Sequence, residues 1–314
     1  MKNQMQSRPH ILRNLIIFAA AALGIGWLGI AADIAVEAAD PQQGFGMLLW
    51  IVVPTATGLI LRAFGGDGWK DSGIKPNFKN GWGWYLAAPG IFLAAFLPMF
   101  GLGRIFNAFS IPGFQTRGVV DFISLTAAAF FPLIVKNIFE EFAWRGYLTA
   151  RFEALKIHPM FNHLLTGAIW GTWHIPYWLY FADRAEVLKF STLEIRAFIL
   201  LGLFNLIVTA VTYGELRLLG KSVWMTIVLH STANAVTQTL LLNGFIKLNG
   251  GMGILFSPGN DGILSSILFG LIGVGLYLYR VRKTRREAAA AQGGRDVPEI
   301  NVIHDCRNLT GDCP

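Results

Sequence analysis

Three pairs of polar or aromatic residues, each separated by four positions, interrupt long apolar stretches of the sequence. The pairs are Glu141 with Arg145, Trp170 with His174, and His230 with Asn234, and Glu140 directly precedes the first pair. Residues four positions apart share one face of an α-helix, so both members of a pair can point into one cavity. An ionisable side chain within a membrane-spanning segment costs about 2.5–3.5 kcal/mol on insertion scales, which makes these residues functional candidates.

The side-chain types in these pairs are suited to hydrolysis when they act together. The first pair alone is compatible with the solvated end of a helix, and a single histidine such as His174 is more often a hydrogen-bonded packing residue. His230 and Asn234 can also bond to neighbouring membrane helices. Together, however, a glutamate, two histidines and an asparagine can activate water and stabilise an oxyanion. The combination therefore favours a catalytic site.

The composition indicates that the elements carrying these residues lie in a membrane. Apolar residues make up 54% of the 314 positions and charged residues only 14%, whereas about a quarter of the residues in a soluble domain are charged. The formal net charge of +7 does not require a nucleic-acid partner, because membrane proteins collect Lys and Arg on their cytoplasmic side.

About 20 mostly apolar residues are needed for a helix to cross a bilayer. Eight segments meet this requirement: 11–36, 46–64, 82–103, 119–147, 161–181, 195–214, 223–242 and 263–279. We therefore expect an all-α fold, a polytopic membrane helix bundle with about eight transmembrane helices. Glu140 reaches the depth of the two histidines only if the fourth helix continues to about Arg151, which the sequence allows because no proline intervenes.

The distribution of Lys and Arg predicts the orientation of the bundle. Basic residues concentrate before the first segment, in alternate loops and after the last segment, so we expect both termini in the cytoplasm. The site would then open toward the cytoplasm. The apolar run at 15–32 resembles a signal peptide, but it is long enough to span the bilayer, which favours an uncleaved first helix.

We divide the chain into a transmembrane bundle, residues 1–284, and a polar cytoplasmic tail, residues 285–314, which we expect to be disordered. The tail contains both cysteines, Cys306 and Cys313. With only His304 nearby and no fourth ligand, the two cysteines do not form a zinc-binding signature.

The three motifs together resemble those of the CAAX protease and bacteriocin-processing family of intramembrane proteases, also called the CPBP or Abi family and similar to the Ras-converting CAAX endopeptidases. That family carries a Glu-Glu-x-x-x-Arg, an aromatic-x-x-x-His and a His-x-x-x-Asn motif on successive core helices. The resemblance covers about residues 119–242, the predicted protease core. Two features depart from the family pattern: Trp170 stands where Phe is usual, and Lys136 lies one turn before Glu140. The lysine would either keep Glu140 ionised or occupy it in a salt bridge.

The resemblance implies hydrolysis of a peptide bond within the membrane. Glu140, aided by His174, would deprotonate the attacking water, while His230 and Asn234 would donate hydrogen bonds to the oxyanion. Arg145 and Glu141 would form a buried ion pair and complete the expected catalytic set. The resemblance leaves open whether a metal takes part. Glu140, His174 and His230 are the ligands if zinc is bound with an open position, but their spacing does not require zinc.

The expected partners are a protein or peptide substrate at the membrane and the lipid bilayer, with no nucleic acid. We expect a multi-pass location in a bacterial plasma membrane. Two other functions remain open from the residues alone. One is a non-catalytic scaffold or bacteriocin-immunity protein with the same fold. The other is a small transporter, which would be expected to show broken helices and paired half-repeats.

Overall fold

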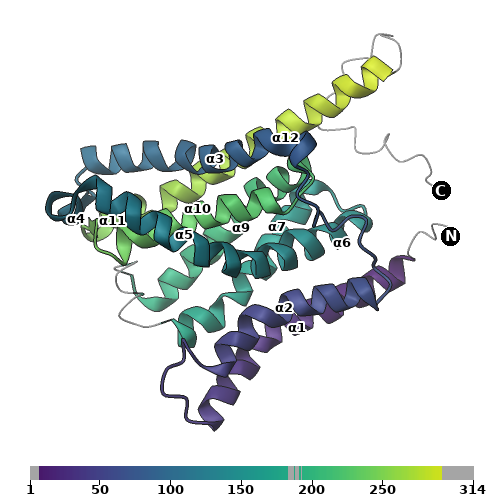
Figure 1. The fold of residues 1–314 in the computed structure, drawn as a ribbon, viewed down its shortest axis with the longest axis horizontal. Helices are drawn as coiled ribbons and strands as arrows, with labels where there is room; N and C mark the ends of the chain where they lie inside the picture. Colours follow the sequence, from purple (N-terminus) through teal and green to yellow (C-terminus); the bar gives the residue numbers. More distant parts are fainter. Residues whose placement is uncertain (1–6, 183–186, 188–190, 192, 292–314) are drawn as a thin grey trace. The chain divides into compact units, whose positions relative to one another are not determined.

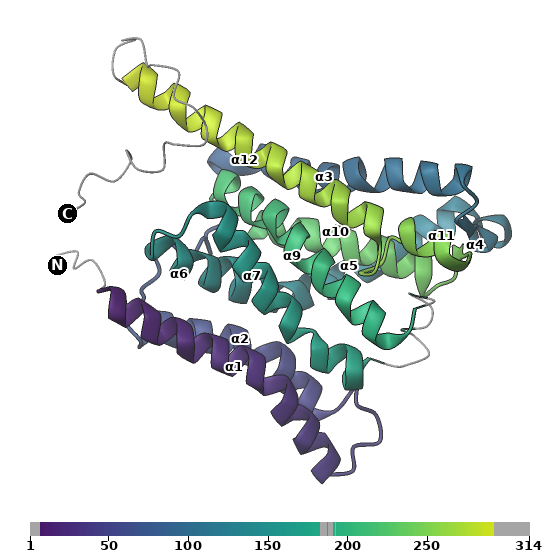
Figure 2. The same ribbon diagram turned by 180° about the vertical axis from the view of Figure 1, so that it is seen from behind.

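The computed structural model describes residues 7–182, 187, 191 and 193–291. The chain divides into two units, residues 1–276 and residues 277–314. Helices dominate the described residues (Figures 1 and 2). In chain order they are α1 (Arg8–Ala35), α2 (Phe45–Ala63), α3 (Phe78–Ile105), α4 (Pro112–Thr116), α5 (Gly118–Ala143), η1 (Trp144–Leu148), α6 (Thr149–Ala154), α7 (Pro159–Trp173), η2 (Tyr177–Phe181), α9 (Ile195–Gly220), α10 (Trp224–Leu241), α11 (Gly250–Leu255) and α12 (Ile263–Ala291).

Six helical segments within the described residues are long and apolar enough to cross a membrane. They are α1, α2, α3, the continuous run Gly118–Ala154, α9 and α12. This finding confirms a helical integral membrane protein. The other two expected spans are also helical, but α7 has 15 residues and α10 has 18. His174 directly follows α7, and His230 lies within α10. Because these two helices are not among the six candidate spans, eight crossings remain a prediction, as does the orientation of the bundle.

The fourth expected helix is longer than its apolar stretch. Because α5, η1 and α6 follow one another without a break, the helix runs to Ala154 rather than ending at Tyr147, as the depth of Glu140 requires. The segment η1 is a π-helix that begins three residues after Glu141 and contains Arg145. A second π-helix, η2, begins three residues after His174. Short π-helical insertions are frequent at functional sites because they change the direction of the side chains that follow.

The helices of the first unit pack in neighbouring pairs that leave the site between them. Helix α1 lies beside α2, α7 beside α9, and α5 beside α10, as both ribbon views show. One apolar cluster joins α1, α2, η1, α7 and η2. It contains Trp50 and Trp173, whose rings stack at 3.8 Å and whose indole N–H groups each donate to the other residue's carbonyl oxygen. A second apolar cluster joins α3, α9, α10 and the first turns of α12.

A small antiparallel pairing closes one end of the first unit. Strand β1 (Phe109–Ser110) follows α3, and strand β2 (Lys247–Leu248) follows α10. Phe109 is paired with Leu248. This contact ties the chain after α10 to the chain after α3, and it is a minor addition to the expected all-α fold.

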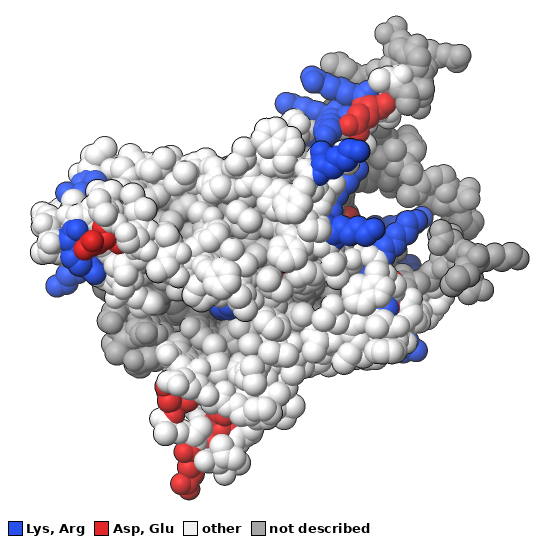
Figure 3. All heavy atoms as spheres, in the orientation of Figure 1, with Lys and Arg blue, Asp and Glu red and all other residues white. Residues whose placement is uncertain are grey.

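The surface is apolar over a broad band. Figure 3 shows one face on which charged side chains lie mainly at the edges and leave most of the area between them uncharged. Many large apolar side chains are exposed, among them Ile16, Phe64, Val120 and Leu271. Exposed apolar area on this scale suits contact with lipid rather than water.

A cluster of mostly buried charged side chains lies around α6 in the first unit. Arg151 pairs with Asp67 at 3.2 Å and also with Asp71. Arg62 pairs with Asp71 at 2.7 Å, and Tyr147 donates a 2.6 Å hydrogen bond to Asp67. These contacts connect α2 and the segment that follows it to η1 and α6, so they fix the end of the long fourth helix.

The second unit departs from the expected disordered tail over residues 285–291. Helix α12 continues to Ala291, because two arginines, a glutamate and an alanine run are strong helix formers. The remainder of the tail, with Cys306 and Cys313, lies outside the described residues.

Candidate active site

The carboxylate of Glu140 lies at a junction of α5 and α7. Its side chain is fully buried. Lys136, one turn earlier on α5, forms an ion pair with Oε1. The indole N–H of Trp170 donates a 2.9 Å hydrogen bond to Oε2, and the same oxygen lies 4.0 Å from Nε2 of His174. The first motif and the second therefore meet at Glu140.

His174 presents one nitrogen to Glu140 and the other to the backbone. Its Nδ1 lies 2.9 Å from the carbonyl oxygen of Trp170. Because a carbonyl oxygen only accepts, Nδ1 must carry the hydrogen, and Nε2 of the neutral ring is then an acceptor. The ring of Trp178, in η2, stacks on His174 with 5.3 Å between centroids. The imidazole is thus held with its free nitrogen toward the Glu140 carboxylate.

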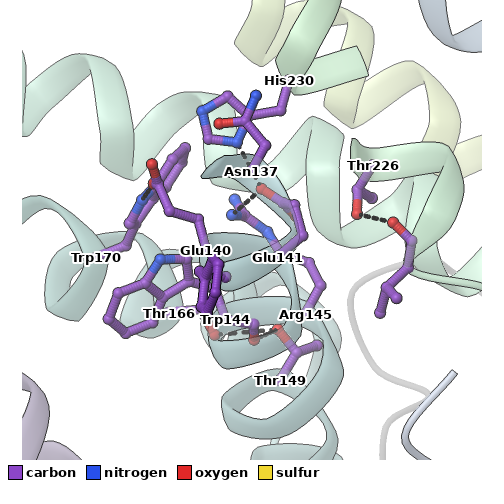
Figure 4. Close-up of polar contacts among 12 residues, drawn as sticks. Asn137, Glu140, Glu141, Trp144, Arg145, Thr149, Thr166, Trp170, Thr226 and His230 are labelled. Atoms are coloured by element: carbon purple, nitrogen blue, oxygen red, sulfur yellow. Dashed lines mark hydrogen bonds and ion pairs between the residues drawn. The ribbon is translucent and has the colours of Figure 1, made fainter. Parts of the chain in front are cut away.

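The neighbouring carboxylate points in a different direction. Figure 4 shows Glu140 beside Trp170, and Glu141 beside Arg145 and His230. Oε1 of Glu141 lies 3.0 Å from Nη1 of Arg145 and 2.9 Å from Nδ1 of His230. Consecutive residues project from a helix about 100° apart. Glu140 therefore faces His174, and Glu141 bonds to His230.

The Arg145 cation is enclosed by aromatic rings as well as by Glu141. Its guanidinium carbon lies 4.2 Å from the ring centre of Trp170 and 4.5 Å from that of Tyr213. The ring of Tyr213 also meets the ring of His230 edge to face, at 5.6 Å. Tyr213 is a site residue that the motif analysis missed, because nothing in the sequence of α9 marks which of its faces is turned toward α10.

Asn234 is held by a second residue that the motif analysis missed. Its Nδ2 donates to Oδ1 of Asn137 at 3.3 Å, and Nδ2 of Asn137 donates to Ser231 at 3.1 Å. Asn137 is fully buried on α5. The sequence carried a signal for it: Asn137 is a polar residue in an apolar stretch, one helical turn before Glu140 and Glu141.

A cavity of about 190 Å³ adjoins these groups. His174, His230 and Asn234 line it, together with Lys136 and Trp170, the two residues that bond to the Glu140 carboxylate. Three of the four expected groups, His174, His230 and Asn234, therefore line one cavity, and Glu140 lies behind its wall in contact with Lys136 and Trp170.

The cavity extends in the direction opposite to the one expected. From the site it continues between α9 and α10 to the segment 258–260, where Asn260 is exposed. The sequence-based orientation places this segment outside the cytoplasm. The reason lies on the other side of the site, where the buried charges of Arg62, Arg145 and Arg151 and their partners occupy the space toward α6.

The histidines are not arranged as ligands of a single metal ion. No group of three His, Cys, Asp or Glu side chains that could hold a metal occurs within the described residues. Nδ1 of His174 and Nδ1 of His230 bond to different partners, and the nearest approach of His174 to Glu140 is 4.0 Å. Glu140, His174 and His230 are therefore not gathered as a metal site in this arrangement, and we assign no step to a metal.

Comparison with known proteins identifies a related family over the part of the chain that carries the site. The family model for Rce1-like proteins, described as type II CAAX prenyl endopeptidase Rce1-like, matches residues 122–236. The match runs from α5 to α10 and includes all three motifs. No curated protein is detectably similar to the chain. Residues 122–236 of the chain, which carry all three motifs, are therefore similar to the Rce1-like type II CAAX prenyl endopeptidases.

Proposed function

We propose that this protein is an intramembrane endopeptidase that cleaves a peptide bond in a membrane-associated protein or peptide, and that Glu140 and His174 activate the attacking water. The supporting observation is the 4.0 Å separation between Oε2 of Glu140 and Nε2 of His174 beside a cavity. Two hydrogen bonds of about 2.8 Å that meet at one water oxygen span roughly 4 to 4.5 Å. One water molecule therefore fits between the two groups.

Both groups accept hydrogen bonds from that water. Nε2 of His174 carries a lone pair because Nδ1 donates to the Trp170 carbonyl oxygen. The Glu140 oxygen has a second lone pair besides the one that Trp170 occupies. With both hydrogens so engaged, the lone pairs of the water oxygen are directed away from the protein groups, toward a substrate carbonyl in the cavity. As the oxygen attacks the carbonyl carbon, Glu140 takes the proton.

His230 and Asn234 would stabilise the oxyanion that forms. Nδ1–H of His230 donates to Glu141, so Nε2 faces the cavity and donates when the ring is protonated. Lys136 and Arg145 supply two positive charges, and Glu140 and Glu141 supply two negative charges. When Glu140 has taken the proton from the water, one of these positive charges is in excess, and the oxyanion neutralises it. Donors fixed in this way act without reorganisation during the reaction.

The tetrahedral intermediate then collapses with cleavage of its carbon–nitrogen bond. Glu140 returns the proton to the leaving amine, so the carboxylate is regenerated for the next turnover. Arg145 takes no part in these transfers. Its contacts with Glu141, Trp170 and Tyr213 hold the carboxylate that orients His230.

A comparison of cell membranes tests the proposal while the substrate is still unidentified. Membranes from cells that make the wild-type protein, Glu140→Gln or Glu153→Gln are analysed by mass spectrometry for new peptide termini. Glu153 lies on α6 and is exposed, so its substitution makes the same chemical change away from the site. We expect the same new termini with wild type and Glu153→Gln and none with Glu140→Gln. Identical termini in all three samples would support a non-catalytic scaffold instead.

A further inference from the structure

Two helices of the cavity wall carry polar side chains at regular spacing. On α10, cavity-lining residues recur every four positions: His230, Asn234 and Gln238. On α9 the same spacing places Asn205, Thr209 and Tyr213 in the wall of the same cavity. Residues four apart form one stripe along a helix. Each helix therefore presents a continuous polar stripe to the cavity.

Both stripes start at the candidate active site; the stripe on α10 ends at the loop that contains Pro258, and the stripe on α9 ends at the first turn of α12. At one end, the rings of Tyr213 and His230 are in contact. At the other end, Thr237 bonds to the carbonyl oxygen of Pro258, and Asn205 donates a 2.7 Å hydrogen bond to Ser266. The remaining wall is largely aromatic and includes Phe92, Trp178, Phe198 and Phe269.

Several groups of the stripes have no partner in the described part of the protein. The amide of Gln238 forms no hydrogen bond to another described residue, and Oδ1 of Asn205 and Oδ1 of Asn234 accept none. Asn205, Asn234 and Gln238 all border the cavity, so these groups are open to a ligand that enters it. These amides are therefore suited to a ligand that supplies both donors and acceptors.

From this arrangement we propose that the two stripes bind the backbone of an extended peptide, so that Gln238 and Asn205 position the substrate on one side of the cleaved bond. This inference rests on the proposed peptidase function. Main-chain N–H and C=O groups also need partners inside a membrane, and an amide side chain offers both a donor and an acceptor. The aromatic wall provides contacts for the side chains of that peptide.

The length of the stripe sets the length of the bound segment. His230 and Gln238 are eight residues apart, which is about 12 Å along a helix. An extended chain advances about 3.3 Å per residue, so about four substrate residues lie along the stripe.

The test compares amide and ester versions of one substrate. The probe is a fluorogenic peptide with a prenylated CAAX carboxyl terminus. In a series of variants of this peptide, one backbone amide at a time, within four residues of the cleaved bond, is replaced by an ester. Gln238→Met removes the amide at nearly constant length. Thr232→Val is the control, because its hydroxyl bonds to Val228 on the same helix and does not line the cavity.

We expect Gln238→Met to raise KM for the all-amide peptide by about three- to tenfold, the value of one hydrogen bond, with kcat nearly unchanged and Thr232→Val like wild type. For wild type, one of the ester-substituted peptides should show a KM raised by a similar factor. For Gln238→Met, the same ester should cause no further increase in KM, because the substitution and the ester remove the same hydrogen bond. Asn205→Leu should give the same pattern at a different ester position.

Equal KM values for Gln238→Met, Asn205→Leu and Thr232→Val would overturn the inference while leaving the peptidase intact. Binding of the peptide to the Glu140→Gln protein, followed by fluorescence anisotropy, separates the two proposals further. If wild type does not cleave the peptide and Glu140→Gln does not bind it, both the proposed function and this inference are contradicted. If Glu140→Gln binds the peptide equally well with and without Gln238→Met, only the inference is contradicted.

Discussion

The indole N–H of Trp170 donates a 2.9 Å hydrogen bond to Oε2 of Glu140, although the matching position of the related proteases is usually Phe, which has no donor. The same oxygen faces His174. Trp170 thus fixes the carboxylate rotamer at which the candidate water site forms, and it contacts Arg145 with the face of the same ring. In this chain the aromatic residue of the second motif orients the proposed base as well as packing beside it.

Trp170→Phe should lower kcat by about ten- to hundredfold, because a hydrogen bond to a charged group contributes about 1.5–3 kcal/mol. The phenyl ring keeps the contact with Arg145, so the protein should remain folded. Trp224→Phe is the control, since it also removes an indole hydrogen bond, to Ile74, away from the site. A Trp170→Phe protein with the kcat of wild type would show that Glu140 does not depend on this donor.

Lys136→Met should reduce the cleavage rate by about tenfold, and Lys136→Arg should retain most of it. The cation bonds to Oε1 of Glu140, which leaves lone pairs on the carboxylate for water, and the positive charge keeps the base ionised. Initial rates of the three proteins at neutral pH provide the measurement. Faster cleavage by Lys136→Met would mean instead that the salt bridge occupies the base and restrains the enzyme.

Arg145→Ala should lower the amount of folded protein and its thermal midpoint. Glu141 and Arg145 both have fully buried side chains, and removing one partner of a buried pair costs about 3–5 kcal/mol. Arg196→Ala is the matched control, because the Arg196 side chain is 88% exposed. The two thermal midpoints are compared in the same detergent. Equal midpoints would show that Glu141 is neutral or otherwise partnered.

Asn137→Ala should reduce kcat by about tenfold with KM little changed, and it should also lower the thermal midpoint, because the buried amide bonds to both Asn234 and Ser231. Asn137 does not reach the cavity but accepts the hydrogen bond that orients Asn234, so it is a positioning residue. Asn234→Ala removes the proposed oxyanion donor itself and should cost about 10²–10³ in kcat. The double variant should be no slower than Asn234→Ala alone. If the fold-reduction of kcat in the double variant equals the product of the two single reductions, Asn137 has a role independent of Asn234.

The motifs predicted the contents of the site because four-residue spacing fixes which side chains share a helix face. His174, His230 and Asn234 line one cavity, and Glu140 faces His174 beside it. Periodicity within one helix does not reveal which faces of different helices meet. For that reason Tyr213 became evident only in the packed bundle.

The direction of the cavity depends on contacts between distant parts of the chain. The sequence indicated where positive charges gather, but not that Arg62 and Arg151 would turn inward and pair with Asp67 and Asp71. These buried pairs occupy the space near α6. The 3.6-residue periodicity of an α-helix also could not predict the π-helical segments η1 and η2. Each of them is a wider helical turn that begins shortly after a site residue.

In the proposed reaction, the Glu140 carboxylate is the base that activates water. Glu140→Gln preserves the size of the side chain and its ability to accept the Trp170 hydrogen bond, but it removes the basic oxygen. The decisive measurement is the single-turnover rate of peptide cleavage by purified Glu140→Gln in detergent, beside wild type and Glu153→Gln. We expect no detectable cleavage by Glu140→Gln, with a thermal midpoint close to that of wild type and full activity in Glu153→Gln. Cleavage by Glu140→Gln at the wild-type rate would show that Glu140 is not the base.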